Sequence, residues 1–324
     1  MTYSRRNKVA RLIARKFLLI LIFLPLLNFV GYAYAQVHPR LFSSPLGNAV
    51  SAEFEPYSAY VQGVVLEGDL GRVGNVSIAQ ILSDPVQNSL VLVGFSLLVS
   101  IVLGLLVGLL SVSPRTKRMS TAGLFVLSAG SSMPGFLLGG VLLAGMVYLV
   151  FFSDATSTFL PISGYGLDEH LILPVLVLAI QPTLHLAKVV AGLLENELQK
   201  DYIQVARSKG LSWQRLLWSH ALPNMVSPIL VTIGESVRLM VGALVIIEAV
   251  FIWPGIGRIF LFTIGLRLDA RPPGIYFGNP PLLAAIAVVL GAILLLSDLL
   301  FSVMANVVDP RLSQREDELE TAVA

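Results

Sequence analysis

The chain alternates between long apolar runs, free of charge except for Glu235 and Arg238, and short connections that carry the other Lys, Arg, Asp and Glu residues. An α-helix rises 1.5 Å per residue, so about 20 apolar residues cross the hydrocarbon core of a bilayer. Five of the runs match one crossing or fall slightly short of it, and each predicts one membrane-spanning helix. These runs cover residues 17–35, 86–112, 171–187, 225–247 and 282–296.

A sixth run, residues 119–152, is long enough for one tilted helix but too short for two helices and a turn. It contains Met133-Pro134-Gly135, and a proline inside a helix removes a backbone hydrogen bond and bends it. The pattern therefore predicts six membrane-spanning helices, with a kink in the third.

Composition supports a membrane protein and excludes other classes. Of 324 residues, 55% are hydrophobic and only 13% are charged, and the mean hydropathy is +0.80. A soluble domain of this size needs a more polar surface, and a disordered chain has fewer apolar residues. With 22 Lys and Arg against 20 Asp and Glu, no strongly basic surface for nucleic acid is expected. Cysteine is absent, which excludes disulfides and thiol chemistry.

The distribution of Lys and Arg predicts the orientation. Sixteen of them lie in the N-terminal segment, the second-to-third connection, the fourth-to-fifth connection and the C-terminal tail, whereas five lie in the alternate connections. Cytoplasmic segments of membrane proteins are enriched in Lys and Arg. We therefore expect a multi-pass protein of the plasma or inner membrane, with both termini in the cytoplasm.

The N-terminal segment has an alternative interpretation as a signal peptide. A basic start, an apolar stretch and the small-x-small sequence Ala33-Tyr34-Ala35 are typical of a cleaved leader. The apolar stretch of 19 residues is long for a signal sequence, and cleavage would break the charge alternation. A retained helix is the favoured interpretation.

The fold class expected is an all-α integral membrane protein with six transmembrane helices and a cytoplasmic helix-turn-helix. Residues 1–35 form the basic N-terminus and first helix, and residues 36–85 an exoplasmic segment. Residues 86–310 form a five-helix core that includes the loop 195–224, and residues 311–324 an acidic cytoplasmic tail.

Motifs for covalent chemistry are absent from the sequence. There is no phosphate-binding loop of the Gly-x-x-x-x-Gly-Lys-Ser/Thr type and no Gly-x-Ser-x-Gly nucleophile elbow. The histidines lack metal-ligand spacing; they are His38, His170, His185 and His220. We predict no catalytic residues, no metal site, no cofactor and no enzyme activity in this chain.

The loop 195–224 is unusually long for a connection between membrane helices. Gly210 follows an amphipathic stretch, where a left-handed helix cap would lie, and Ser212 can cap a second helix that Pro223 ends. The apolar positions at helical spacing are Leu198, Tyr202, Val205 and Ala206. The pattern predicts a short helix, a glycine turn and a second helix.

The shape of this hairpin leaves two interpretations open. It can dock an apolar face into the groove of a partner protein, with the small residues Ala206 and Gly210 permitting close approach. It can also lie on the lipid surface, assisted by its basic residues.

The residues of the hairpin resemble a known family. The run from Asp201-Tyr202 through Gln204-Val205-Ala206 to Gly210-Leu211, followed by Leu222-Pro223, is similar to the coupling loop of binding-protein-dependent ABC transporter permeases. The run from Gly242 to Arg258 and the terminal Asp309-Pro310-Arg311 resemble further signatures of the dipeptide/oligopeptide/nickel subfamily. Three ordered motifs favour the docking interpretation.

The chain departs from the family pattern in places. Gln204 and Val205 stand where the motif has Glu-Ala, and His220 where it has Ile. The segment 269–281 is longer and richer in proline than expected, and its role is open.

The resemblance implies a permease subunit of an ABC importer. It forms half of the pore for a peptide-like solute (a dipeptide, an oligopeptide or a nickel chelate). Its partners are a second homologous permease, cytoplasmic ATPase subunits, an extracytoplasmic solute-binding protein and the bilayer. The alternative is a secondary transporter or channel that ATP does not drive.

Charged residues in the fifth predicted helix are candidates for the pore or a gate. Glu235 and Arg238 are three residues apart and can pair on one helix face, either in a wet translocation path or as a self-neutralised structural pair. Glu248 lies near the outer end of this helix, followed by residues that form either a hinge or re-entrant turn or an ordinary turn; they are Pro254, Gly255 and Gly257.

Overall fold

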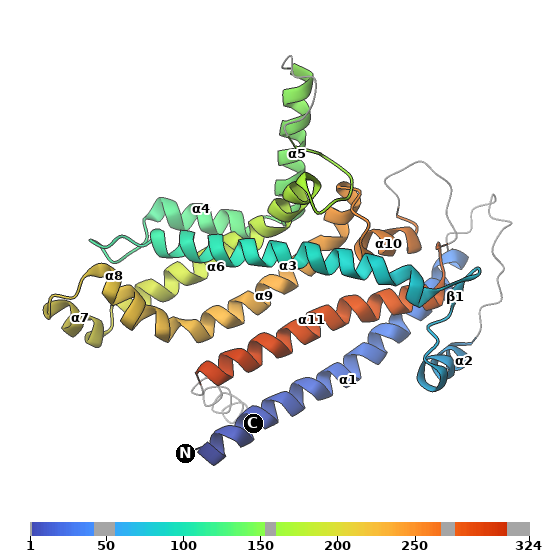
Figure 1. Ribbon diagram of the computed structural model, residues 1–324, viewed down its shortest axis with the longest axis horizontal. Helices are drawn as coiled ribbons and strands as arrows, with labels where there is room; N and C mark the ends of the chain where they lie inside the picture. The colour runs from blue at the N-terminus through green and yellow to red at the C-terminus, as the bar shows by residue number, and fades with distance from the viewer. Residues whose placement is uncertain (1, 42–55, 153–159, 267–275, 310–324) are drawn as a thin grey trace.

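Long apolar helices lie side by side and make up most of the structure (Figure 1). The computed structural model describes residues 2–41, 56–152, 160–266 and 276–309. The long helices are α1 (Thr2–Leu41), α3 (Ile78–Leu110), α4 (Thr121–Ser132), α5 (Gly135–Phe152), α6 (Ile172–Leu198), α9 (Leu222–Val250) and α11 (Pro280–Val308). The short elements are α2 (Tyr57–Gln62), η1 (Gly63–Glu67), β1 (Arg72–Val73), β2 (Val76–Ser77), η2 (Glu169–Leu171), α7 (Asp201–Ser208), α8 (Trp213–Leu216), η3 (Leu217–Ala221) and α10 (Ile256–Thr263).

The predicted spans coincide with these helices. In the described part of the chain, five helices are long and apolar enough to cross a membrane, or six if α4 and α5 are counted as one broken span. This confirms an all-α membrane protein. The helices extend beyond the predicted bounds, and α6 continues eleven residues past 187. Lys188, which the charge pattern places in a connection, therefore lies well inside α6.

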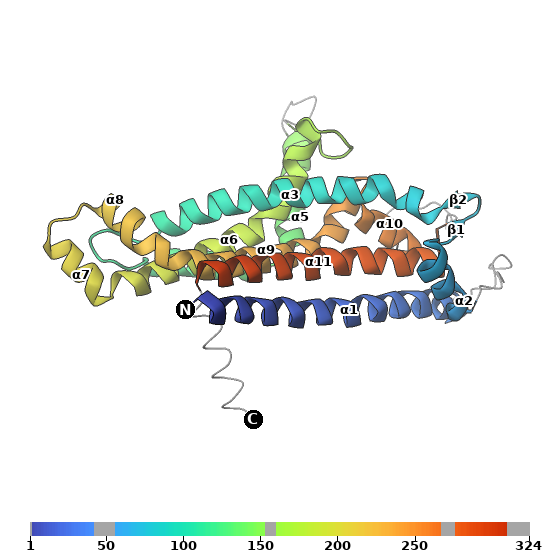
Figure 2. The same ribbon diagram turned by 60° about the horizontal axis from the view of Figure 1, so that its bottom comes forward.

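The third predicted helix is broken rather than kinked. Helix α4 ends at Ser132, Met133 is extended (φ −82°, ψ 132°), and α5 leaves at 96° to α4. The residue before a proline avoids the helical conformation, so Pro134 ends α4 instead of bending it. Helix α5 projects away from the other long helices (Figures 1 and 2).

Small side chains let α3 pack closely on α6. Ser96 and Ser100 donate to backbone oxygens of α6, at 3.3 Å and 3.1 Å. At Gly108 an added Cβ would lie 2.7 Å from the Cβ of Val190. Stripes of small residues and serine-to-carbonyl hydrogen bonds are the usual means of close helix packing in membranes.

Helices α1 and α11 also lie side by side (Figure 2). An added Cβ at Gly31 would lie 3.0 Å from the carbonyl oxygen of Leu283, so glycine permits this approach. The possible cleavage site 33–35 lies within the continuous helix α1, and Ala35 is buried. This packing favours the retained helix, which stays a prediction.

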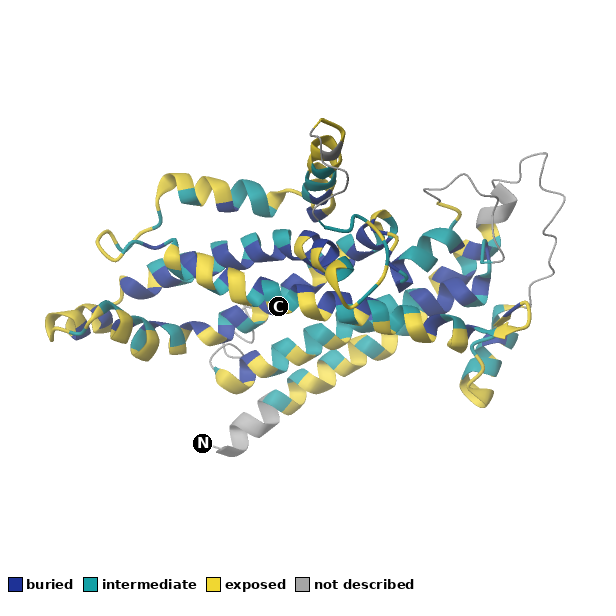
Figure 3. Ribbon diagram, turned by 45° about the horizontal axis from the view of Figure 1, so that its top comes forward, coloured by how far each residue is buried: buried dark blue, intermediate teal, exposed yellow. Residues whose placement is uncertain are grey.

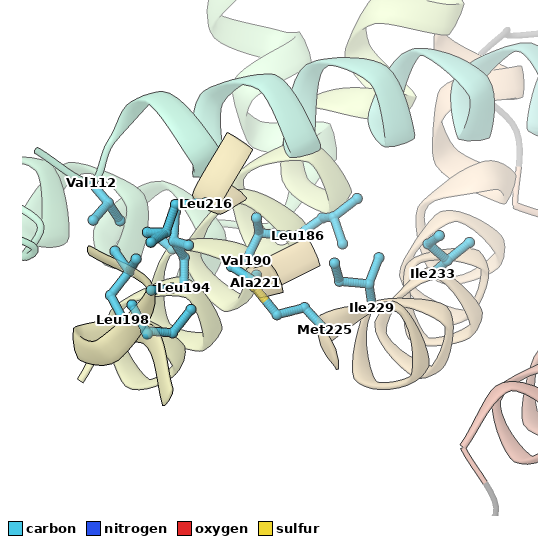
Figure 4. Packing of buried hydrophobic residues seen from close by; sticks show 13 residues of the cluster. Val112, Leu186, Val190, Leu194, Leu198, Leu216, Ala221, Met225, Ile229 and Ile233 are labelled. Carbon is cyan, nitrogen blue, oxygen red and sulfur yellow. The ribbon is translucent and has the colours of Figure 1, made fainter. Parts of the chain in front are cut away.

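Burial concentrates on α6 and α9, while α1 and α5 are largely exposed (Figure 3). One hydrophobic cluster joins the ends of α6 and α9 to α7 and α8 (Figure 4). We call this end of the bundle, which carries residues 195–224, the loop end, and the opposite end the turn end.

At the turn end, residues 56–77 of the predicted exoplasmic segment pack on α1 and α11. Tyr60 stacks on Tyr32 with ring centroids 5.0 Å apart, and Asn28 donates to the hydroxyl of Tyr60 at 3.3 Å. The strands β1 and β2 pair antiparallel. Residues 42–55, the tail 310–324 and the part 267–275 of the proline-rich segment lie outside the described residues.

Candidate coupling and gating sites

The loop 195–224 forms a helical hairpin that extends beyond the rest of the bundle (Figure 1). Helix α7 ends at Ser208, and Gly210 has φ +80°. Ser212 caps α8 by accepting from the Arg215 backbone N–H at 3.5 Å. The left-handed region costs least at glycine, which explains the turn. The predicted helix, glycine turn and capped second helix are present.

The prediction that Pro223 ends the second helix is wrong. Helix α8 continues through η3, a π-helical turn over Leu217–Ala221, directly into α9. A proline removes one backbone donor and its ring crowds the preceding turn. The wider π turn just before Pro223 accommodates this ring. The hairpin therefore connects by one helical path, residues 213–250, to the opposite end of the bundle.

One side of the hairpin is anchored on the bundle. Ile203 and Leu216 are buried in the cluster at the loop end, and Leu211 packs against it. Ala206, also in this cluster, is 9% exposed. The expectation that Ala206 permits a partner to approach is therefore wrong, because its methyl group faces the chain's own core.

The other side of the hairpin is open. Val205 is 53% exposed and Trp218 70% exposed, and Pro223 is exposed while Leu222 is half-buried. A Cβ at Gly210 would meet no atom within 4 Å. The outer surface of the hairpin thus offers apolar side chains that the described residues leave uncovered.

A polar network holds the base of the hairpin. Tyr202 donates its hydroxyl to Glu197, whose carboxylate also lies 2.5 Å from the Lys200 ammonium. Asn224, at the start of α9, donates to the Tyr202 hydroxyl oxygen at 2.8 Å. Burial, and after it the neighbouring Glu197 carboxylate, raise the pKa of Tyr202 to about 12, while the hydrogen bond from Asn224 opposes this shift. The network ties α6, α7 and α9 together; Asp201, by contrast, is exposed in the first turn of α7.

Glu248 lies at the turn end, fully buried. It accepts from the Ser89 hydroxyl at 2.5 Å and from the backbone N–H groups of Gly257 and Arg258 at 2.7 Å and 3.3 Å. Ser89 in turn accepts from the Ile256 backbone at 2.9 Å. A carboxylate at a helix N-terminus is stabilised by the free N–H groups there. Glu248 thus fixes the start of α10.

Glycines 255 and 257 are required by this geometry. An added Cβ at Gly255 would lie 2.0 Å from Oε1 of Glu248, and one at Gly257 would lie 2.6 Å from the Cα of Val245. Contacts this short do not occur in real structures, so any larger residue displaces the carboxylate or the α9 backbone.

Helix α9 ends in a Schellman motif. Trp253 donates its backbone N–H to Glu248 at 2.8 Å and Ile252 to Ala249 at 3.3 Å, the two bonds of that motif. Asn88 of α3 donates to the Pro254 oxygen at 3.0 Å. The chain then turns back, and α10 packs on α9 and α3. The four predicted gate residues at this end are therefore brought together in one turn.

The predicted pairing of Glu235 with Arg238 is wrong. Glu235 lies 3.3 Å from Nε2 of His185 on α6, whereas Arg238 lies 3.6 Å from Asp298 on α11. Lys16 of α1 also contacts Asp298, at 2.5 Å. The two residues are neighbours on α9, but each turns toward a different adjacent helix.

Several residues of these sites were not found from the sequence. The contact of Glu197 with Tyr202 spans five positions, which is not a helical contact spacing; it forms because the helix breaks at Gln199 and Lys200. Ser89 and Glu248 are 159 positions apart, and no local pattern connects them. The sequence feature that could point to these sites was a charged residue within or next to an apolar run, and it identified only Glu235, Arg238 and Glu248.

Comparison with known proteins agrees with these features. Residues 100–314 match the family described as the binding-protein-dependent transport system inner membrane component. The chain is 30% identical over 263 residues to the dipeptide transport system permease protein DppB of Lactococcus lactis, covering 80% of each. It is 29% identical over 259 residues to the probable peptide ABC transporter permease protein y4tP of Sinorhizobium fredii (76% of this chain, 77% of the relative).

A third relative is the oligopeptide transport system permease protein AppB of Bacillus subtilis, 26% identical over 257 residues (77% of this chain, 78% of the relative). These matches confirm the predicted ABC permease subunit and its non-catalytic class, and they favour it over the secondary transporter or channel. The chain belongs to the family of inner-membrane components of binding-protein-dependent transport systems.

Proposed function

We propose that this chain forms half of the translocation pore of an ABC importer for short peptides. The names of the relatives support the solute class, since they refer to dipeptide, oligopeptide and peptide transport. The other half is a second permease of the same family, and a solute-binding protein delivers the peptide at the turn end.

We propose further that the hairpin 195–224 receives the movement of a cytoplasmic ATPase. The observation that carries this proposal is the continuous helical path over residues 213–250, which begins on the hairpin and passes Glu235 and Arg238. Because one side of the hairpin is packed on the bundle and the other is open, a partner that pulls on Val205 and Trp218 moves α9 with them.

The proposed orientation places the loop end in the cytoplasm. The start of α1, the end of α11 and the hairpin lie at this end (Figures 1 and 2), in agreement with the Lys and Arg distribution. Since the chain has no cysteine, single cysteines test this directly. Ser163→Cys should react with an impermeant reagent from outside the cell, and Ser208→Cys should react only after the membrane is opened. External labelling of Ser208→Cys would contradict the orientation.

Three substitutions at Gly210 test the coupling role. The site has φ +80° and open space around it, so the isolated chain resists a side chain only through its backbone. Asparagine tolerates this conformation and β-branched valine does not. Gly210→Val should therefore abolish peptide-stimulated ATP hydrolysis by the assembled complex, Gly210→Ala should reduce it, and Gly210→Asn should retain most of it.

The control is Gly94→Val on α3, where an added Cβ also meets nothing within 4 Å and the backbone is helical. All four variants should reach normal abundance in the membrane. Normal ATP-driven uptake by Gly210→Val would show that the hairpin is not the coupling element and would return it to the lipid-surface interpretation.

A further inference from the structure

A polar stripe runs along the partly exposed faces of α6 and α9 at mid-helix. On α6 it contains Gln181, His185 and Lys188, spaced four and three residues apart, and on α9 it contains Glu235 and Arg238. These spacings place the members of each helix on one face. The His185–Glu235 contact of 3.3 Å joins the two halves of the stripe.

The stripe is unusual because its charges are neither buried nor at a helix end. The side chains of Glu235 and Arg238 are 45% and 62% exposed, and both lie near the middle of α9. A charged side chain at this depth is costly against lipid and faces a water-filled cavity or another protein. The stripe therefore marks a side of the bundle that faces a water-filled cavity or another protein chain rather than lipid.

The charges of the stripe are incompletely compensated. Within the described parts of the chain, Lys188 forms no ion pair or hydrogen bond, although ten residues of α6 separate it from the loop end. The partner of Glu235 is His185, which balances the negative charge of the carboxylate only when the imidazole is protonated. A structural ion pair would not leave one ammonium free.

The helices run antiparallel through the stripe, so its charges occupy three levels. Lys188 lies three residues from His185 toward the loop end, and Arg238 lies three residues from Glu235 toward the turn end. At 1.5 Å per residue each step is about 4.5 Å, so Lys188 and Glu235 are offset by about 4.5 Å along the bundle. They lie on the adjacent helices α6 and α9, whose axes are about 8–10 Å apart. An extended dipeptide or tripeptide, which spans roughly 7–11 Å, can reach from one to the other.

Open space adjoins both cations. Gly192 is four residues beyond Lys188, and Gly242 is four residues beyond Arg238 on the same faces, and a Cβ added at either would meet nothing within 4 Å. The face beside the charges is therefore not filled by any residue that the structure describes.

We infer that this stripe is a solute-contact site that recognises the two charged ends of a short peptide in transit. Glu235 accepts the α-ammonium group, and Lys188, one turn nearer the loop end, binds the α-carboxylate. The inference rests on the proposed function, since it assigns residues of the permease itself to the peptide. The occupant is zwitterionic because the site alternates positive, negative and positive charge.

The test uses the complete importer in proteoliposomes with three probes: dialanine, N-acetyl-dialanine and dialanine amide. Uptake of each probe by a variant is divided by uptake of that probe by the wild type. The preference of the binding protein cancels in this ratio, because the same binding protein serves every variant.

Lys188→Met should lower dialanine uptake about tenfold while leaving the amide, which has no carboxylate, within about twofold. Glu235→Gln should lower dialanine and the amide but spare the N-acetyl probe, which has no ammonium. Arg115→Met, which removes one exposed charge outside the helices, is the matched control and should leave all three ratios near one.

Equal loss for all three probes with either variant would assign the stripe a structural or subunit-contact role and overturn the inference, as would unchanged uptake by Lys188→Met. If the wild type takes up none of the three probes while a longer or unrelated solute stimulates its ATP hydrolysis, the proposed peptide function fails instead. Lys188→Met keeps the test valid if Glu235→Gln does not fold.

Discussion

A buried glutamate lies beside each end of the long helical path over residues 213–250, Glu197 of α6 at the loop end and Glu248 at the turn end, and the two are held differently. At the turn end, Glu248 is fully buried and bonded to a serine hydroxyl and to backbone N–H groups. At the loop end, Glu197 is bonded to Tyr202 and Lys200, two flexible side chains that are themselves partly exposed.

The turns beside these two glutamates also differ in how tightly their surroundings hold them. Gly210 has φ +80° with free space around it, whereas Ile252 has φ +57° and is a β-branched residue in the left-handed region. Such strain persists only where the surroundings impose it. Here buried Trp253 imposes it, with its Nε1 donating to Asn88 at 3.2 Å.

This difference indicates which end can move. Rigid backbone donors and close glycine contacts fix the turn end, so α3, α9 and α10 move there as one body. At the loop end the hairpin packs on the buried cluster, but the polar contacts at its base involve partly exposed side chains, which exchange more readily with a partner. If the hairpin has the coupling role proposed above, a movement received there is pivoted about the turn end.

Gly257→Ala should have the largest effect on stability. Its Cβ would lie 2.6 Å from the backbone of Val245 and 3.0 Å from Glu248, and overpacking a core costs about 3 kcal/mol when the backbone must yield. Thermal unfolding in detergent should show a strongly lowered midpoint. Gly94→Ala is the control, because nothing lies near it. Equal melting of the two variants would contradict a fixed turn end.

Alanine at each glutamate compares the two ends directly. Glu248→Ala leaves buried N–H groups of α10 without an acceptor, at about 1–3 kcal/mol for each unsatisfied group. Glu197→Ala should cost about 1 kcal/mol, since Lys200 is half exposed and finds water. The midpoints of thermal unfolding of the two variants show which of them loses more stability. A larger loss from Glu197→Ala would reverse the assignment of the rigid end.

Ile252→Gly should stabilise the protein slightly. Removing the backbone strain of a β-branched residue in the left-handed region stabilises the fold by about 1–2 kcal/mol. The loss of the Ile252 side chain, which is 47% exposed, opposes this gain. We expect a net gain below about 1 kcal/mol, visible as a small rise in the unfolding midpoint. A fall would show that the Ile252 side chain contributes packing that exceeds its strain.

The sequence predicted what local patterns determine. Apolar runs located the spans, Gly210 and Ser212 located the hairpin, and charges in apolar runs located Glu235, Arg238 and Glu248. Each of these signals is carried by a few neighbouring residues, as helix spacing and caps are.

Two of the errors concern partners that are distant in sequence. Arg238 bonds to Asp298 instead of Glu235, and Ala206 packs on its own core. Spacing on one helix allows a contact but does not decide it when an adjacent helix offers a competing group. The helix continues through Pro223 because a π turn precedes this proline, and no residue pattern in the sequence predicts that turn.

The pH dependence of the loop end is the smallest expected effect. The pKa of Tyr202 is raised to about 12, above its ordinary value near 10, because burial and Glu197 favour the neutral phenol. The stability contributed by the neutral phenol is therefore complete below pH 10 and is lost as the pH rises toward 12. The difference in unfolding midpoint between the wild type and Tyr202→Phe should be constant below pH 9 and vanish near pH 12. The other tyrosines titrate in both proteins and cancel in this difference. A difference that stays constant throughout would show that the Tyr202 phenol does not hold Glu197, and the hairpin would then be fixed by its apolar contacts alone.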